Sequence, residues 1–393
     1  MKRLLHSLVL IAFPFFASAQ NPTIQAIINA VNIDSLMQNA NEISGEVGVV
    51  VNGVTDTIKS RNRNQPGNEL CFRYLRDKLI SWGYQVDSLA FGASDGKNIW
   101  AVKTGNIYPN EPVIICAHYD GMPNLPVAPA ADDDASGMSA VLEAARVMAS
   151  YNFEHTVIFA LWDDEEYGLA GSNAFATLHD NANDSIYGVI NMDAIAWDSD
   201  NDSVARVHTR PIANSEMIAD TVIAVNTDYT IGIDLLVNNP GATYSDHASF
   251  WNHDYGAVLL IEDWDNDANT HYHDATDEVQ YFNIPYYHKM SRLSIGATAA
   301  LAVPYNSGAG IEEETGELIR LYPNPAHGTV NISWQNDYET LEITDVLGKI
   351  VYSTVVTEDV KGTTLDLAAY RNGIYFVKLA NKDRQVTQKL IRK

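Results

Sequence analysis

The sequence predicts an α/β domain followed by a small all-β domain. Apolar, strand-like runs alternate with helix-like segments through most of the chain, which is typical of a mixed, mostly parallel sheet covered by helices on both faces. After residue 317 the pattern changes to short alternating segments separated by turn residues, as in a β-sandwich. The charge changes at the same point, because only 8 of the 50 acidic residues follow residue 317, against 10 of the 25 basic ones.

The first 19 residues have the composition of a signal peptide. Lys2 and Arg3 form a positive start, residues 4–16 are apolar, and residues 17–19 supply the small side chains of a cleavage site. The apolar run is too short to span a membrane, and no later stretch is long enough. We therefore expect an exported, soluble chain that begins at Gln20 and has no transmembrane segment.

Composition also limits the partners. The net charge of −25 argues against nucleic acid or an anionic membrane surface. The two cysteines, Cys71 and Cys116, lie among apolar residues. We expect two free buried thiols rather than one disulfide.

The elements of the α/β domain follow from periodicity. Residues 23–37 and 68–82 have helical spacing, with Gly83 in the usual place after a helix. A strand pair is expected at residues 98–104 and 112–117, and the second strand is continuously apolar, as when both faces are buried.

The next helix is expected over residues 134–151, with Asp134 or Ser136 as its N-cap. Three later apolar strands are expected at residues 156–162, 185–192 and 257–261.

Residues 304–317 have the composition of a linker. The strands expected beyond it are residues 330–334, 340–344, 349–355, 362–367, 373–379 and 385–392. The expected organisation is a signal peptide (1–19), an α/β domain (20–303), a linker (304–317) and a β-sandwich (318–393).

Candidate metal ligands follow the expected strands at their carboxyl ends, where sites form in open α/β sheets. Asp132, Asp133 and Asp134 at the start of a helix would repel one another without a cation. Helix capping explains one or two of these acids and leaves Asp133 unexplained. The other groups at strand ends are His118 and Asp120, residues 163–166, Asp193, and His271 and His273.

These residue types indicate zinc. Histidine nitrogens and carboxylates without a thiolate suit a hydrolytic rather than a structural site, and a carboxylate shared by two metals builds a co-catalytic pair. Any one of these residues alone is ordinarily structural. Their joint occurrence at the strand ends of one domain predicts a metal centre.

The motifs resemble, in order and near spacing, those of the secreted dizinc aminopeptidases of the bacterial leucyl aminopeptidase family. Glutaminyl cyclases and the glutamate carboxypeptidase group share that fold. The resemblance covers residues 25–303 and rests on His118-x-Asp120, residues 131–137, 164–172, 191–193 and 245–250, and His273.

The resemblance implies a role for each site residue. Asp133 would bridge two Zn²⁺ ions, with His118 and Asp193 completing one site and Glu166 and His273 the other. Glu165 would be the catalytic general base, and Asp120 would orient His118. The family also implies a cis peptide between Asp133 and Asp134.

The implied function is an exported metallo-aminopeptidase that hydrolyses N-terminal residues from peptides or proteins. A glutaminyl cyclase, a carboxypeptidase or dipeptidase, and a non-catalytic binding module remain alternatives. Retention of both His118 and Asp193 favours two metals and hydrolysis over the one-zinc cyclase.

The chain departs from the family near its Ser-Asp-His motif. Ala242 stands where the family has its carbonyl-polarising tyrosine, and Tyr244 is adjacent to the motif, so no residue is assigned that role. Asp246 and His247 are as well explained as hydrogen-bonded loop residues. The candidates for lining a side-chain pocket are Trp197, Phe250, Trp264 and Tyr272.

The tail resembles the C-terminal sorting domain of type IX secretion. The resemblance rests on residues 321–325, 373–378 and 389–393. It implies a Gram-negative source, passage through the periplasm, the type IX machinery as a partner, and a secreted or cell-surface location. A carbohydrate-binding β-sandwich is the alternative, although the tail lacks an exposed aromatic triplet.

Overall fold

The computed structural model describes residues 20–92, 96–305, 319–334, 337–345, 349–357, 360–382 and 385–393. The chain divides into two compact units, residues 1–305 and 306–393. The expected signal peptide, and the expected linker apart from residues 304 and 305, lie outside the described residues. None of the described helices has the length and apolar character needed to cross a membrane.

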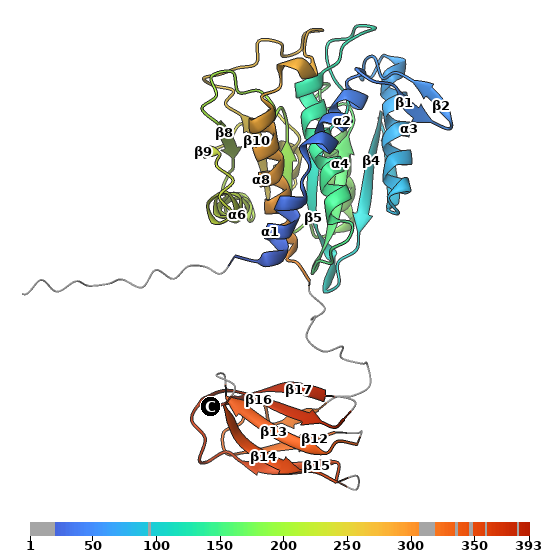
Figure 1. The fold of residues 1–393 in the computed structure, drawn as a ribbon. Coiled ribbons are helices and arrows are strands. Elements are labelled where there is room, and N and C mark those ends of the chain that lie inside the picture. The colour runs from blue at the N-terminus through green and yellow to red at the C-terminus, as the bar shows by residue number, and fades with distance from the viewer. Residues whose placement is uncertain are drawn as a thin grey trace, which may run out of the picture. The chain divides into compact units, whose positions relative to one another are not determined.

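An eight-stranded mixed sheet forms the centre of the first unit (Figure 1). Its strands lie in the order β3 (Gln85–Phe91), β4 (Gly96–Lys103), β6 (His155–Trp162), β5 (Tyr108–His118), β7 (Gly188–Met192), β10 (Ala257–Glu262), β8 (Val204–His208) and β9 (Asp234–Asn238). The pairings β6–β5, β5–β7, β7–β10 and β8–β9 are parallel, and the other three are antiparallel. The expected mixed, mostly parallel sheet is confirmed.

The expected pairing of residues 98–104 with residues 112–117 is wrong. Both segments are strands, β4 and β5, but β6 lies between them, antiparallel to β4 and parallel to β5. An apolar run identifies a buried strand without identifying its neighbour. A helix connects β5 to β6, which makes this part of the chain a βαβ unit.

Helices cover both faces of the sheet. Their bounds are α1 (Pro22–Ala30), α2 (Ile33–Ile43), α3 (Pro66–Ser81), α4 (Gly137–Met148), α5 (Ala170–Ala182), α6 (Ser215–Asp228), α7 (His247–Trp251) and α8 (Ile284–Ala302). α4 and α8 lie side by side against β5 on one face (Figure 1). α5 and α7 contact each other over the other face.

Strand β5 shows why its run is continuously apolar. Val113, Ile115 and Ala117 join the core on one face of the sheet, while Ile114 and Cys116 join the core on the other. Cys71 and Cys116 are both buried and free, as expected.

Two helix starts differ from the expectation. Residues 23–37 are not one helix, because α1 ends at Ala30 and Asn32 caps a new helix by accepting a hydrogen bond from the Ser35 N–H (3.1 Å). The helix expected from Asp134 becomes regular only at Gly137. Asp134 does cap it, accepting from the Gly137 N–H (2.9 Å), whereas Ser136 makes no capping bond.

The remaining strands lie outside the large sheet. β1 (Val49–Val51) and β2 (Val54–Asp56) form a hairpin in the first unit. The strands of the second unit are β11 (Arg320–Tyr322), β12 (Thr329–Ser333), β13 (Thr340–Asp345), β14 (Ile350–Val355), β15 (Gly362–Asp366), β16 (Gly373–Ala380) and β17 (Gln385–Arg392). They form antiparallel sheets of three and four strands around a shared core, which confirms the small β-sandwich.

Candidate metal centre

The parallel strands bring the candidate ligands to one edge of the sheet. His118 at the end of β5 is in register with Trp162 at the end of β6, and Cys116 is in register with Asn191 of β7. The segments that leave these strands therefore start beside one another. They carry Asp120, Glu165 and Glu166, and Asp193.

Five of the candidate ligands converge into two groups that share one residue. The His118 Nε2 lies 3.1 Å from Asp133 Oδ1 and 3.6 Å from Asp193 Oδ1. The His273 Nε2 lies 3.1 Å from Asp133 Oδ2 and 2.8 Å from Glu166 Oε2. Within each group the candidate ligand atoms lie within 4.8 Å of one another. Asp133 thus turns one carboxylate oxygen toward each histidine.

The three consecutive aspartates have separate tasks. Asp132 accepts from the Ala196 N–H and from the Asn269 side chain, both at 2.9 Å. Asp134 accepts from backbone N–H groups, including that of Ala194 at 3.3 Å. Asp133 alone faces the histidines, and its peptide bond to Asp134 is cis, which confirms the expected cis bond.

In the group formed by Asp133, Glu166 and His273, the charges are unbalanced without a cation. Burial lowers the pKa of His273, but hydrogen bonds to Asp133 and Glu166 raise it to about 10. Burial and repulsion from Asp133 raise the pKa of Glu166 to about 7, although the His273 hydrogen bond opposes this rise. Clustered carboxylates therefore hold protons that a divalent cation would displace.

His118 shows the same imbalance. Burial lowers the pKa of this side chain, but the surrounding carboxylates, with Glu165 the strongest, raise it well above its ordinary value.

The donor set fits zinc. Oε1 of Glu166 is buried and makes no hydrogen bond to any described residue, while the ring nitrogens of His118 and His273 lie 2.8–3.6 Å from carboxylate oxygens. Buried polar atoms ordinarily have partners and clustered carboxylates repel one another, so this set of atoms fits a bound cation. Imidazole nitrogens and carboxylate oxygens without a thiolate are the ligands of hydrolytic zinc sites.

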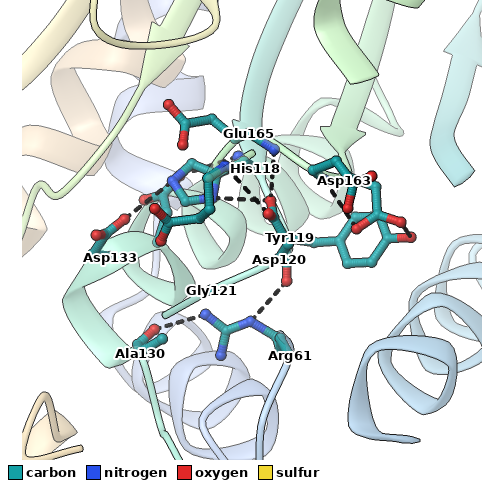
Figure 2. Close-up of polar contacts among 12 residues, drawn as sticks. Arg61, His118, Tyr119, Asp120, Gly121, Ala130, Asp133, Asp163 and Glu165 are labelled. Carbon is teal, nitrogen blue, oxygen red and sulfur yellow. Dashed lines mark hydrogen bonds and ion pairs between the residues drawn. The ribbon is translucent and has the colours of Figure 1, made fainter. Parts of the chain in front are cut away.

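Asp120 connects the end of β5 to the end of β6 (Figure 2). Its carboxylate lies 3.5 Å from the His118 Nδ1 and accepts from the N–H groups of Glu165 (3.0 Å) and Glu166 (3.2 Å). A carboxylate on the second ring nitrogen fixes the orientation of a metal-binding histidine. The orienting role of Asp120 stays a prediction, which this contact supports.

The adjacent glutamates point to different surroundings. Glu166 lies against His273, whereas Glu165 belongs to neither group and lines a cavity in front of them. Burial, with repulsion from Asp193 among other carboxylates, raises the pKa of Glu165 well above its ordinary value, against an opposing attraction from His118. Glu165 is thus a carboxylate that holds a proton readily and lies beside both groups without belonging to either.

The cavity has a volume of about 620 Å³. Its acidic lining residues are Asp133, Glu165, Glu166 and Asp193, and its other lining residues are Gly168, Leu169, Ala194, Thr243, Tyr244, Ile261, Trp264 and Tyr272. Trp264 and Tyr272 lie where they were expected. Phe250 and Trp197 do not line it, because Phe250 is fully buried in the core and Trp197 packs against His271.

A hydrogen-bonded loop forms one wall of the cavity. The Tyr244 hydroxyl lies 3.3 Å from Nε2 of His208, whose Nδ1 accepts from the Ala242 N–H at 3.0 Å. Buried His247 bonds the Ala242 carbonyl through Nε2 at 2.9 Å. His247 therefore holds the loop, while Tyr244, 46 % exposed, faces the cavity.

Some residues around the site could not be found from sequence. Asp277 accepts from the backbone N–H groups of Asp132 and Asp133 at 3.0–3.1 Å. His271, a candidate from sequence, instead stacks on Tyr281. No local pattern marks Asp277, because it lies far along the chain from the residues it holds.

Comparisons with known proteins agree with this geometry. Residues 98–298 match peptidase family M28, and residues 320–393 match the secretion system C-terminal sorting domain. A curated relative, leucine aminopeptidase 1 of Paracoccidioides brasiliensis, is 27 % identical over 208 residues, covering 49 % of this chain and 53 % of the relative. The chain thus spans about half the length of this relative, and 68 % of the length of leucine aminopeptidase 1 of Neurospora crassa, to which it is 27 % identical over 280 residues.

Solved structures share the fold. The LapA aminopeptidase of Legionella pneumophila is 19 % identical with a TM-score of 0.62, over 78 % of this chain and 81 % of that one. The glutaminyl cyclase of Fimbriiglobus ruber is 19 % identical with a TM-score of 0.56, over 68 % of this chain and 94 % of that one. At this level of identity the likeness establishes the fold alone.

Proposed function

The chain belongs to peptidase family M28, and from that premise we propose that it is an exported aminopeptidase with a two-zinc centre. The observation that carries the proposal is the pair of ligand groups joined by Asp133, with Glu165 beside them. His118, Asp133 and Asp193 would hold one ion. Asp133, Glu166 and His273 would hold the other.

Bound there, zinc supplies a Lewis acid that polarises a peptide carbonyl and makes a water molecule more acidic. The protein supplies the proton transfer. Glu165 takes a proton from the attacking water and passes it to the leaving amine, so that the peptide bond breaks as the new C–O bond forms. Burial, which raises the pKa of Glu165, suits this task, because a carboxyl group that holds a proton more readily can carry it from the water to the amine.

The charge of the cavity supports action at the N-terminus of a peptide. Four carboxylates line it, and none of its described lining residues is Lys or Arg. With two Zn²⁺ ions bound, the four carboxylate charges would be neutralised, but the described lining would still offer no cationic side chain to hold the C-terminal carboxylate that a carboxypeptidase recognises. This observation favours an aminopeptidase over a carboxypeptidase on the same fold.

The walls indicate room for an apolar first side chain. Leu169, Ile261, Trp264 and Tyr272 line the cavity beyond the carboxylates, and the Trp264 and Tyr272 rings pack edge to face at 4.5 Å. The sorting domain supports secretion through the type IX machinery to the medium or the cell surface.

The test compares aminoacyl substrates with the same substrates blocked at the amine. We expect the zinc-loaded chain to hydrolyse only the unblocked set, to carry about two zinc ions per chain, and to lose activity to a chelator. Cyclisation of an N-terminal Gln without hydrolysis would instead identify a glutaminyl cyclase. A fully active preparation without bound metal would overturn the proposal.

A further inference from the structure

Arg61 is a buried arginine whose hydrogen bonds all go to backbone carbonyls. It lies between β2 and α3 and is 1 % exposed. Its Nε donates to the Tyr119 carbonyl (2.9 Å), Nη1 to those of Ile43 (3.1 Å) and Pro129 (2.7 Å), and Nη2 to that of Ala130 (2.7 Å). Among the described residues it has no ion-pair partner.

This arrangement is unusual, because a buried charge is costly and is ordinarily paired with an opposite one. Four carbonyl oxygens offset part of the cost. Two of these carbonyls, those of Tyr119 and Ala130, tie Arg61 to the backbone of the candidate metal centre.

Three of the four carbonyls that Arg61 binds belong to the segments that carry two ligands of one metal group, and the fourth is that of Ile43 in α2. Tyr119 lies between His118 and Asp120, and Ala130 lies just before the stretch that contains Asp133 (Figure 2). One rigid guanidinium thus joins the end of β5 to the start of the aspartate stretch.

The two segments also touch directly. A Cβ added to Gly121 would lie 2.8 Å from the Ala130 Cβ and 3.6 Å from Nη2 of Arg61. Real Cβ atoms do not approach so closely, so only glycine allows the spacing that Arg61 spans.

We propose that Arg61 is a positioning residue for the metal centre, which sets the separation of His118 and Asp133 by bonding the backbone beside His118 and three residues before Asp133. The inference rests on the proposed function, because it assumes that both residues bind zinc. Arg61 is not among the residues that line the cavity, and its hydrogen bonds go to backbone carbonyls and not to the side chains of the candidate ligands. Its contribution lies in holding the ligands apart by the distance that one ion requires.

Substitution by lysine separates geometry from charge. Arg61→Lys keeps the positive charge but replaces a planar fork of five donors by one flexible ammonium group. It cannot make all four carbonyl bonds at once. Arg146→Lys is the matched control, because Arg146 also bonds a buried partner, Glu143, from α4 and has no contact with the candidate ligands.

The experiment uses the full chain and measures zinc affinity by chelator competition, together with the Tm with and without zinc. We expect Arg61→Lys to raise the zinc Kd about 10- to 100-fold, the usual effect of losing a group that supports a ligand. The difference between the zinc-loaded and zinc-free Tm should shrink as well, because stabilisation by a ligand falls with its affinity. Arg146→Lys should leave both the Kd and that difference unchanged.

An equal drop of both Tm values in Arg61→Lys with an unchanged Kd would make Arg61 merely structural and overturn the proposal. If Arg61→Lys does not fold, Gly121→Ala decides, because it forces the same segments apart while Arg61 stays. A raised zinc Kd in Gly121→Ala supports the proposal, and an unchanged Kd contradicts it. A wild-type chain that binds no zinc would instead refute the proposed function before any variant is compared.

Discussion

At the scale of single residues, the candidate site depends on neighbours in sequence that do different work. Glu165 and Glu166 are adjacent, yet only Glu166 lies against His273. The turn after β6 separates them, and their backbone N–H groups are both held by Asp120. Substitution of Glu165 should therefore change the rate, and substitution of Glu166 should change metal binding.

Glu165→Gln should keep the metals while kcat falls about 10²- to 10⁴-fold, because a general base is lost and no ligand is removed. Glu166→Gln should weaken one metal, so that activity depends on added zinc. Elemental analysis beside steady-state kinetics measures both effects. Metal loss in Glu165→Gln, with retention in Glu166→Gln, would reverse the two roles.

Two histidines that hold the cavity loop, His208 at the end of β8 and His247 at the start of α7, predict the pH dependence of stability. Burial, with nearby Arg206, lowers the pKa of His208 to about 4, and burial lowers that of His247 to about 3. An unfolded chain takes up these protons from a pH of about 6.5 downward, whereas the folded chain resists them. Above about pH 6.5 the two neutral histidines therefore make their full contribution to the free energy of unfolding. That contribution is lost as the pH falls toward about 4 for His208 and about 3 for His247.

His208→Asn should lose less stability than the wild type between pH 7 and 4.5. Its amide oxygen can still accept from the Ala242 N–H in place of the imidazole Nδ1. Urea unfolding of zinc-free protein at both pH values measures the difference. Equal losses in the two proteins would show that His208 does not contribute.

At the scale of helices and strands, the sequence was most informative where an element is buried. The apolar runs of β5, β6, β7 and β10 were recognised, whereas β3, β8 and β9 were not. Strand β9 lies at the sheet edge with three of its five residues exposed, so its sequence is less apolar, and β8, although mostly buried, contains Arg206 and His208. The order of the strands could not be predicted from the sequence either, because the pairing of β6 with β4 depends on contacts between segments far apart in the chain.

The candidate ligands were found because each follows a strand or starts a helix, where topology brings distant segments together. Arg61 and Asp277 were missed for the opposite reason. Asp277 bonds backbone groups of the aspartate stretch and Arg61 bonds backbone groups just before it, and backbone hydrogen bonding leaves no residue-type pattern in the sequence.

Strand β6 provides a test of the core. Phe159 is fully buried and its ring packs edge to face on Tyr84 at 5.4 Å. Phe159→Ala should lower the free energy of unfolding by about 3–5 kcal/mol, through lost burial and the cavity left behind. Val50→Ala on the exposed hairpin is the control and should change it by less than about 0.5 kcal/mol. Similar values for the two variants would contradict the central place of β6 in the core.

At the scale of the whole molecule, the chain combines an acidic M28 unit with a sorting domain that has its own apolar core. Removal of residues 319–393 should leave kcat/KM unchanged, because each unit folds on its own core. The same deletion should retain the protein in the cell envelope. Activity assays and cell fractionation measure the two effects, and normal export of the truncated chain would refute the sorting role.

The sharing of Asp133 makes the two ligand groups one thermodynamic system. Its two oxygens face different histidines, so an ion on one side orients the carboxylate that the other side requires, and also repels the second ion. Whatever the sign of this coupling, it acts equally in both directions. A binding isotherm should therefore report a pair of linked constants, and only changes at the unshared ligands, such as Asp193 or Glu166, can adjust one ion with little effect on the other.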